Sequence, residues 1–134
     1  MIKLVYRKFI LTFILLGLLV ILAANVNATF NPALRLNYVV LEKEFVQPGD
    51  TFFVIVKTEN HGPRTYSQLR LKIEIPELEV AVTSAEYKLS KYDREFRKSF
   101  VTIPGNVKPG SYVMKITVGN DEVKRVKYRY VTVI

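Results

Sequence analysis

From Leu34 to the end of the chain, apolar and polar residues alternate with a period of two. The clearest run is LRLKIEI at 69–75, whose leucines and isoleucines fall on one face of an extended strand while its charged residues fall on the other. Pro76 then ends the run, because proline cannot donate a hydrogen bond within a sheet. The pattern therefore predicts strands with one buried and one solvent-exposed face.

Runs of the same kind recur after turn residues, and we expect strands at 35–45, 51–59, 69–75, 80–83, 86–89, 95–103, 111–118 and 122–133. Their number and spacing predict an all-β fold, an immunoglobulin-like antiparallel β-sandwich of about seven strands over residues 34–134. We expect the short runs at 80–83 and 86–89 to cross from one sheet to the other.

Two similar stretches, VQPGDTFF at 46–53 and VKPGSYVM at 107–114, each precede a predicted strand. In both, proline presets the first central position of a turn and glycine allows the positive φ needed at the second, so both pairs predict type II corners: Pro48 with Gly49 and Pro109 with Gly110. The residues after each pair share only the alternation, so the stretches are not an internal repeat. The hydroxyl of Tyr112 is a candidate to close the second corner; the alternative is an ordinary half-buried aromatic.

The first 28 residues have a different pattern. A basic stretch, MIKLVYRK, precedes an almost unbroken apolar run from Phe9 to Ala24. This order is typical of a signal peptide, here with a cleavage site after Ala28, or of an uncleaved N-terminal membrane anchor, since the run approaches the length that spans a bilayer. In both cases the basic flank stays inside and the chain after Asn25 faces outward.

Residues 36–133 resemble the CARDB-like and related immunoglobulin-like modules of exported bacterial and archaeal envelope proteins, including surface-layer-like proteins. The motifs that carry the resemblance are Pro48-Gly49, Asn60-x-Gly62, Ile75-Pro76 and Pro109-Gly110-x-Tyr112. These are structural motifs, so the resemblance implies the sandwich fold and an envelope location and names no activity.

Composition argues against catalysis. The chain has no cysteine, which excludes disulfides, thiolate metal sites and cysteine nucleophiles, and His61 is the only histidine, in a turn-like ENHGP segment where we expect it to face solvent. Asn120, Asp121 and Glu122 could supply oxygen ligands to calcium, but they also fit a simple hairpin turn. We therefore predict no enzyme activity, no metal site and no cofactor.

The formal net charge is +8, and the last predicted strand concentrates cations. If Val126 and the neighbouring tyrosines face inward, Arg125, Lys127 and Arg129 line up outward at alternate positions as a basic stripe, which Lys124 near the turn extends. Such a stripe could bind an envelope protein, an acidic glycan or an anionic lipid; alternatively, its charges only prevent aggregation at a sheet edge. An export signal argues against nucleic acid.

Together these features predict an exported, non-enzymatic module for structural or adhesive protein or glycan interactions at the outer face of the cytoplasmic membrane or in the cell envelope. The module would be secreted if the signal is cleaved and would hold the membrane through its N-terminal segment if it is not. Two alternatives are a pilin-type filament subunit with a hydrophobic N-terminal helix and an accessory ligand-binding domain of an envelope complex.

Overall fold

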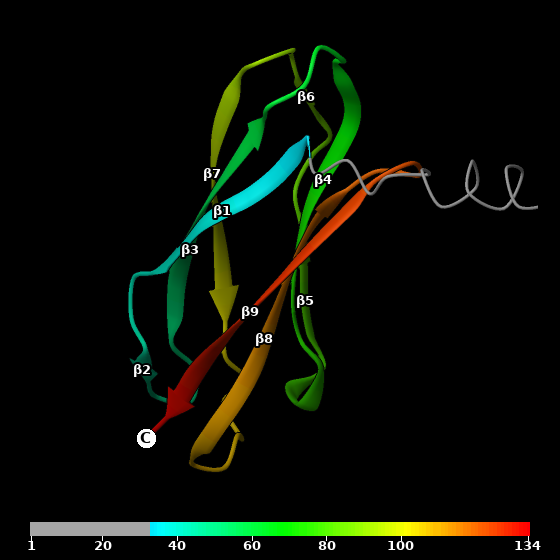
Figure 1. Cartoon of the computed structure of the whole chain (residues 1–134). Helices are drawn as coiled ribbons and strands as arrows, with labels where there is room; N and C mark the ends of the chain where they lie inside the picture. Colours follow the sequence, from blue (N-terminus) through cyan, green and yellow to red (C-terminus); the bar gives the residue numbers. More distant parts are fainter. Residues whose placement is uncertain (1–32) are drawn as a thin grey trace, which may run out of the picture. The chain divides into compact units, whose positions relative to one another are not determined.

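The computed structural model describes residues 33–134 (Figure 1). The strands are β1 (Leu34–Leu41), β2 (Phe45–Val46), β3 (Thr51–Asn60), β4 (Tyr66–Ile75), β5 (Val80–Thr83), β6 (Tyr87–Leu89), β7 (Arg94–Thr102), β8 (Gly110–Gly119) and β9 (Lys124–Val133), with one turn of 3-10 helix, η1 (Pro76–Leu78). No helix in this part of the chain is both long and apolar enough to cross a membrane. The predicted signal or anchor at 1–28 lies outside the described residues.

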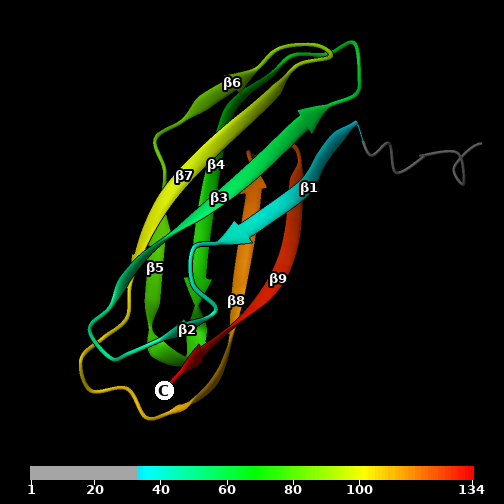
Figure 2. The ribbon, with the colours of Figure 1, turned by 90° about the vertical axis from the view of Figure 1, so that its left-hand side faces the viewer.

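The strands form two sheets that pack face to face (Figure 2). The small sheet has the order β1-β3-β7, and the large sheet has the order β2-β9-β8-β4-β5, with β6 also pairing with β4. The predicted all-β sandwich is confirmed. The pairing is antiparallel except between β2 and β9, which run parallel.

The strand predicted at 35–45 is two strands in different sheets. β1 pairs with β3, and after the segment 42–44 the short β2 pairs with β9. A register shift between Leu36 and Tyr38 bends β1, and the crossing is held by backbone bonds from Glu42 to Phe53 and from Thr132 to Glu44. The crossing falls at Glu42, Lys43 and Glu44, a segment without an apolar residue, so alternation gives no information on which sheet the chain follows there.

The crossover predicted at 80–89 is wrong. β5 and β6 both pair with β4, so neither strand leaves that neighbour. The chain reaches the small sheet only after β6, through the turn at 90–93 that leads into β7.

The core consists of alternate residues from the facing strands. Every second residue of β3 from Phe52 to Asn60 is buried, and the predicted apolar face of 69–75 is buried on β4. Burying one such large aliphatic or aromatic side chain contributes about 1.5–3 kcal/mol, which makes the period-two pattern the main determinant of the fold. The core also contains a polar contact between the hydroxyls of Thr58 and Tyr87, 3.0 Å apart, and burial raises the pKa of Tyr87.

The corner at Pro48 and Gly49 is the predicted type II turn. Gly49 has φ +86°, and the amide of Asp50 donates to the carbonyl of Gln47 at 3.1 Å. The Asp50 carboxylate also accepts from the Gln47 amide at 2.9 Å. The turn therefore delivers the chain into β3 with both ends of the corner hydrogen-bonded.

The corner at Pro109 and Gly110 differs from this prediction. Gly110 has φ +158° and already belongs to β8, so it does not occupy the central position of a type II turn. Instead the Tyr112 hydroxyl donates to the carbonyl of Lys108 at 2.7 Å, which is the bond of a tyrosine corner. The two proline-glycine pairs thus begin strands by different means.

Asn60 holds the bend after β3. Its side chain is buried, its Oδ1 accepts from the Gly62 amide at 3.0 Å, and its Nδ2 donates to the carbonyls of Arg64 at 2.5 Å and Ser90 at 3.0 Å. One amide side chain therefore joins the end of β3 to the turn after β6, which explains the asparagine at this position.

Candidate functional site

The predicted basic stripe does not form one outward surface, because the prediction of which side of β9 faces solvent is wrong. Arg125, Lys127 and Arg129 are half-buried and share the inner face of β9 with Val131 and Val133. In the register with β8 they lie beside core residues, and directly paired residues of neighbouring strands project to the same side.

Arg125 and Lys127 line the side of the sandwich where β9 meets β1, which we call the seam. Arg125 Nε donates to the carbonyl of Leu34 at 2.8 Å, and Lys127 Nζ donates to the carbonyl of Asn37 at 3.1 Å. The edge of β9 is paired by β2 only at its last residues, so water reaches its inner face along the seam. Long cationic side chains suit this place because their stems pack on apolar surface while their heads bond to edge carbonyls.

The outward residues of β9 are instead largely apolar and aromatic. Val126, Tyr128 and Tyr130 are 39%, 57% and 66% exposed, and we call them the tyrosine strip. In the register with β8, Tyr128 is paired with Lys115 and Tyr130 with Val113. The strip therefore lies on the outer face of the large sheet, with a lysine next to its central ring.

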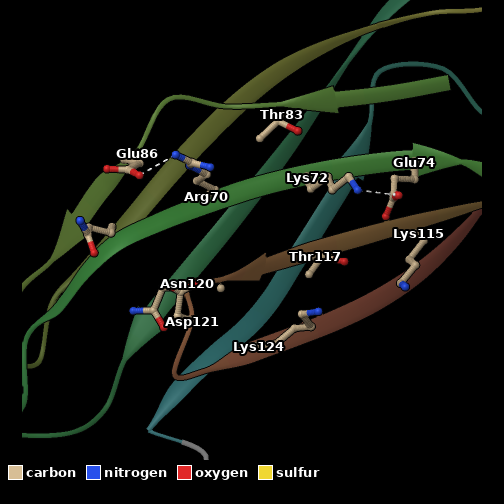
Figure 3. A pocket seen from close by; sticks show the side chains of 12 residues that line it. Arg70, Lys72, Glu74, Thr83, Glu86, Lys115, Thr117, Asn120, Asp121 and Lys124 are labelled. Atoms are coloured by element: carbon tan, nitrogen blue, oxygen red, sulfur yellow. Dashed lines mark hydrogen bonds and ion pairs between the residues drawn. The ribbon is translucent and has the colours of Figure 1, made fainter.

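A shallow basin of about 660 Å³ lies on the same outer face, over β4, β8 and the turn between β8 and β9 (Figure 3). Two of its cations are paired with carboxylates: Arg70 with Glu86 at 2.6 Å and Lys72 with Glu74 at 2.8 Å. The remaining lining includes Lys115, Lys124, Asp121, Asn120, Thr83 and Thr117.

Lys115 and Lys124 make no salt bridge within residues 33–134. Their field is nevertheless visible at Glu74, whose pKa is lowered mainly by the hydrogen bond from Lys72 and further by the charges of these two lysines. Lys124 is the only member of the predicted stripe that lines the basin. The basin is thus a polar, hydroxyl-bearing hollow with two cations available to an anionic ligand.

Two of the residues considered for catalysis or metal binding, Asn120 and His61, make hydrogen bonds within the domain. Asn120 Oδ1 accepts from the amides of Glu122 and Val123, so the predicted hairpin turn is formed and its amide oxygen is already bonded. His61 lies in the loop after β3 with its Nε2 3.0 Å from Glu59 Oε2. Within 33–134, no three histidine, cysteine, aspartate or glutamate residues group as metal ligands would.

The sequence pattern predicts neither the basin nor the exposure of the tyrosines. The basin joins residues from segments about 50 positions apart, which no local pattern connects. Residues 124–130 have large side chains at both odd and even positions, so their pattern does not show which side of β9 faces inward.

No protein-family model matches the chain, and no curated protein matches it in sequence. Solved structures match it in fold. The C-terminal domain of wzt superposes with a TM-score of 0.60 at 9% identity, over 78% of this chain and 75% of that one. The CARDB domain of a Pyrococcus furiosus protein superposes with a TM-score of 0.55 at 14% identity, over 76% of this chain and 94% of that domain.

A third match is the alkylpurine DNA glycosylase AlkC of Pseudomonas fluorescens bound to DNA containing an abasic site analog, with a TM-score of 0.57 and 11% identity. The match covers 83% of this chain but only 33% of the glycosylase structure. Likenesses at these identities concern the fold alone. Residues 33–134 therefore have the all-β fold of CARDB-like and other immunoglobulin-like domains.

Proposed function

We propose that the protein is an exported, non-enzymatic binding module at the outer face of the cytoplasmic membrane, and that its large sheet binds an acidic glycan of the cell envelope. The observation that carries the proposal is the position of Lys115 and Lys124, which make no salt bridge within the described domain, at a polar basin beside the tyrosine strip. The export signal predicted from residues 1–28 and the CARDB-like fold support the location.

The chemistry of this face suits a charged sugar polymer. Carboxylate or phosphate groups of the glycan would pair with the two lysine amines, and hydroxyls would bond to the threonines and ion pairs of the basin. The apolar faces of sugar rings would pack on Tyr128 and Tyr130, whose rings combine apolar area with a hydrogen-bonding hydroxyl. The face is open and shallow, as binding to a long polymer requires.

The test measures affinity of the purified protein for polygalacturonate and for neutral amylose at low and high salt. We expect binding to polygalacturonate that weakens with salt, and a loss of roughly tenfold in affinity in the double variant Lys115→Gln/Lys124→Gln, because each exposed charge contributes up to about 1 kcal/mol. Tyr128→Ser should weaken binding at both salt concentrations, since ring packing is not screened.

The matched control is Lys43→Gln/Lys108→Gln, which removes the same charge from two exposed loop positions away from the basin. The proposal is wrong if this control loses as much affinity as the basin variant, or if amylose binds as tightly as polygalacturonate.

The export part of the proposal has its own test, the intact mass of the protein recovered from membrane and soluble fractions. A chain that begins at Thr29 means a cleaved module, and a full-length chain in the membrane means an anchored one. A chain cut ahead of Phe9 would instead favour a pilin-type subunit, and a full-length chain in the cytosol would contradict export.

A further inference from the structure

The outer face of the small sheet bears an exposed aromatic and apolar surface that the proposed glycan site does not use. We call it the phenylalanine face, and its apolar members are Tyr38, Val40, Phe53, Ile55, Phe96 and Phe100. Phe96 and Phe100 are 58% and 60% exposed, and the rings of Phe53 and Phe100 meet edge to face with centroids 6.4 Å apart. Phenyl rings have no polar group to bond to water, so a contiguous surface of this kind marks an interaction site.

Lysines are interleaved with these rings. In the register of β3 and β7, Ile55 is paired with Lys98 and Phe96 with Lys57. Lys98 Nζ lies 4.2 Å from the centroid of the Phe53 ring, and Lys57 Nζ lies 6.0 Å from that of Phe96. The amines therefore stand among the rings and share the same outward direction.

The charge of the face is positive. Among the outward positions of β1, β3 and β7, the only carboxylate belongs to Glu59, which is paired with Lys57 at 2.7 Å. Arg94 and Lys98 add cations on β7. A second copy of the same face would bring these cations against one another, so charge complementarity favours an anionic occupant over self-association.

We propose that the phenylalanine face docks on an anionic lipid bilayer, with Phe96 and Phe100 entering the boundary between head groups and acyl chains and Lys98 pairing with lipid phosphates. Rings transfer favourably into this boundary, and lysine stems are long enough to keep their amines at the level of the phosphates. The proposal rests on the proposed location at a membrane and not on the basin. Because the two faces belong to opposite sheets, docking would turn the basin away from the lipid.

The experiment uses tryptophan as a depth probe, because the chain contains none. Full-length protein carrying Phe100→Trp is reconstituted into vesicles of phosphatidylcholine alone or of equal parts phosphatidylcholine and phosphatidylglycerol, with brominated lipid as the quencher. We expect a blue shift and about twofold or greater quenching in the anionic vesicles, reversed by high salt, and little change in the neutral ones. This readout is independent of whether the N-terminal segment holds the membrane.

Tyr128→Trp is the matched control, since Tyr128 is similarly exposed but lies on the outer face of the large sheet. Adding Lys98→Gln to the Phe100→Trp protein should lower the ratio of docked to undocked domain, read from the quenching, about fivefold, because one lysine near an anionic surface contributes about 1 kcal/mol. Lys115→Gln, on the opposite sheet, should leave this ratio unchanged. Phe96→Trp serves as a second probe if Phe100→Trp alters the circular dichroism spectrum.

The proposal is overturned if the probes at 100 and 96 are unquenched in anionic vesicles, or if the probe at 128 is quenched as strongly. Shielding of the probe at 100 from aqueous iodide in the absence of lipid would overturn it in favour of a dimer through this face. A failed glycan assay would leave these results unaffected, since that assay measures affinity for a soluble polymer, whereas this one measures quenching of probes at 96 and 100 by lipid.

Discussion

Neighbouring residues at the end of β3 show how one strand serves the core and the surface at once. Asn60 faces inward and bonds two turns, while Glu59 faces outward and accepts from Lys57 Nζ at 2.7 Å, from His61 Nε2 at 3.0 Å and from the Asn37 amide. The pKa of Glu59 is lowered from 4.5 to about 2, mainly by the hydrogen bond from Lys57 and next by that from His61. The carboxylate form of Glu59 is therefore favoured by the folded state.

Replacing Glu59 should change how stability depends on pH. The pKa of Glu59 is lower in the folded state than in the unfolded state. The ionised Glu59 therefore contributes its full stabilisation above pH 4.5, the pKa in the unfolded chain, and this contribution is lost as the pH falls toward 2. We expect the free energy of unfolding of the native protein to exceed that of Glu59→Gln at neutral pH and the difference to disappear near pH 2. Urea unfolding of both proteins across this range measures it; a difference that persists unchanged at low pH would contradict the assignment.

Among the elements, the β8–β9 hairpin matters most to the candidate site, because it supplies the tyrosine strip and both of the basin's available lysines. Its turn is closed by the Asn120 amide bonding to the Val123 carbonyl at 2.9 Å. Gly119, at the end of β8, has no room for a side chain: a Cβ there would lie 2.3 Å from the Val123 carbonyl oxygen. Glycine is thus needed at this position for close backbone approach, not for an unusual φ.

Gly119→Ala should therefore destabilise the hairpin. We expect a loss of roughly 1–3 kcal/mol in the free energy of unfolding, the usual cost of forcing extra volume into a packed place, and weaker binding of polygalacturonate. Gly105→Ala is the control, because a Cβ at Gly105 meets nothing within 4 Å. Urea denaturation of both variants measures the difference, and equal stabilities would show that the turn adjusts without cost.

At the scale of the whole molecule, the two sheets are joined by a mainly apolar core and, along one side, by the polar seam. Arg125 of the large sheet donates to the Leu34 carbonyl of the small sheet, and Lys127 donates to that of Asn37. These bonds satisfy carbonyls on the edge of β1 that no strand pairs. The outward faces of the two sheets remain available for two different partners, a glycan on one and a bilayer on the other in our proposals.

Arg125→Met tests the seam, since methionine keeps much of the apolar stem and removes the donors. We expect a loss of about 1–2 kcal/mol in the free energy of unfolding, because a half-buried charged donor bonded to a carbonyl is lost. Arg64→Met, which breaks an exposed ion pair with Glu122, should cost less than about 1 kcal/mol. If the two variants unfold at the same urea concentration, the seam contributes no more than an ordinary surface contact.

The sequence alone determined the fold class, most strand positions, the corner at Pro48 and Gly49 and the bend at Asn60. All of these depend on local rules: alternation of apolar residues along a strand, and turn residues with special backbone or hydrogen-bonding properties. The buried face of 69–75 was predictable because its apolar and charged residues separate cleanly between the two sides.

The tertiary structure decided what local rules leave open. Both sides of β9 carry long side chains, so the sequence does not show which side is buried. The tyrosines face outward because the partly open seam lets Arg125 and Lys127 on the inner side reach β1. The basin and the phenylalanine face each combine strands far apart in the chain, and their composition follows from the pairing order of the sheets. The alternation of side chains between the two sides of a strand is a local property. Which of the two sides is buried depends on the strands that cover it, and that is decided only when the two sheets pack.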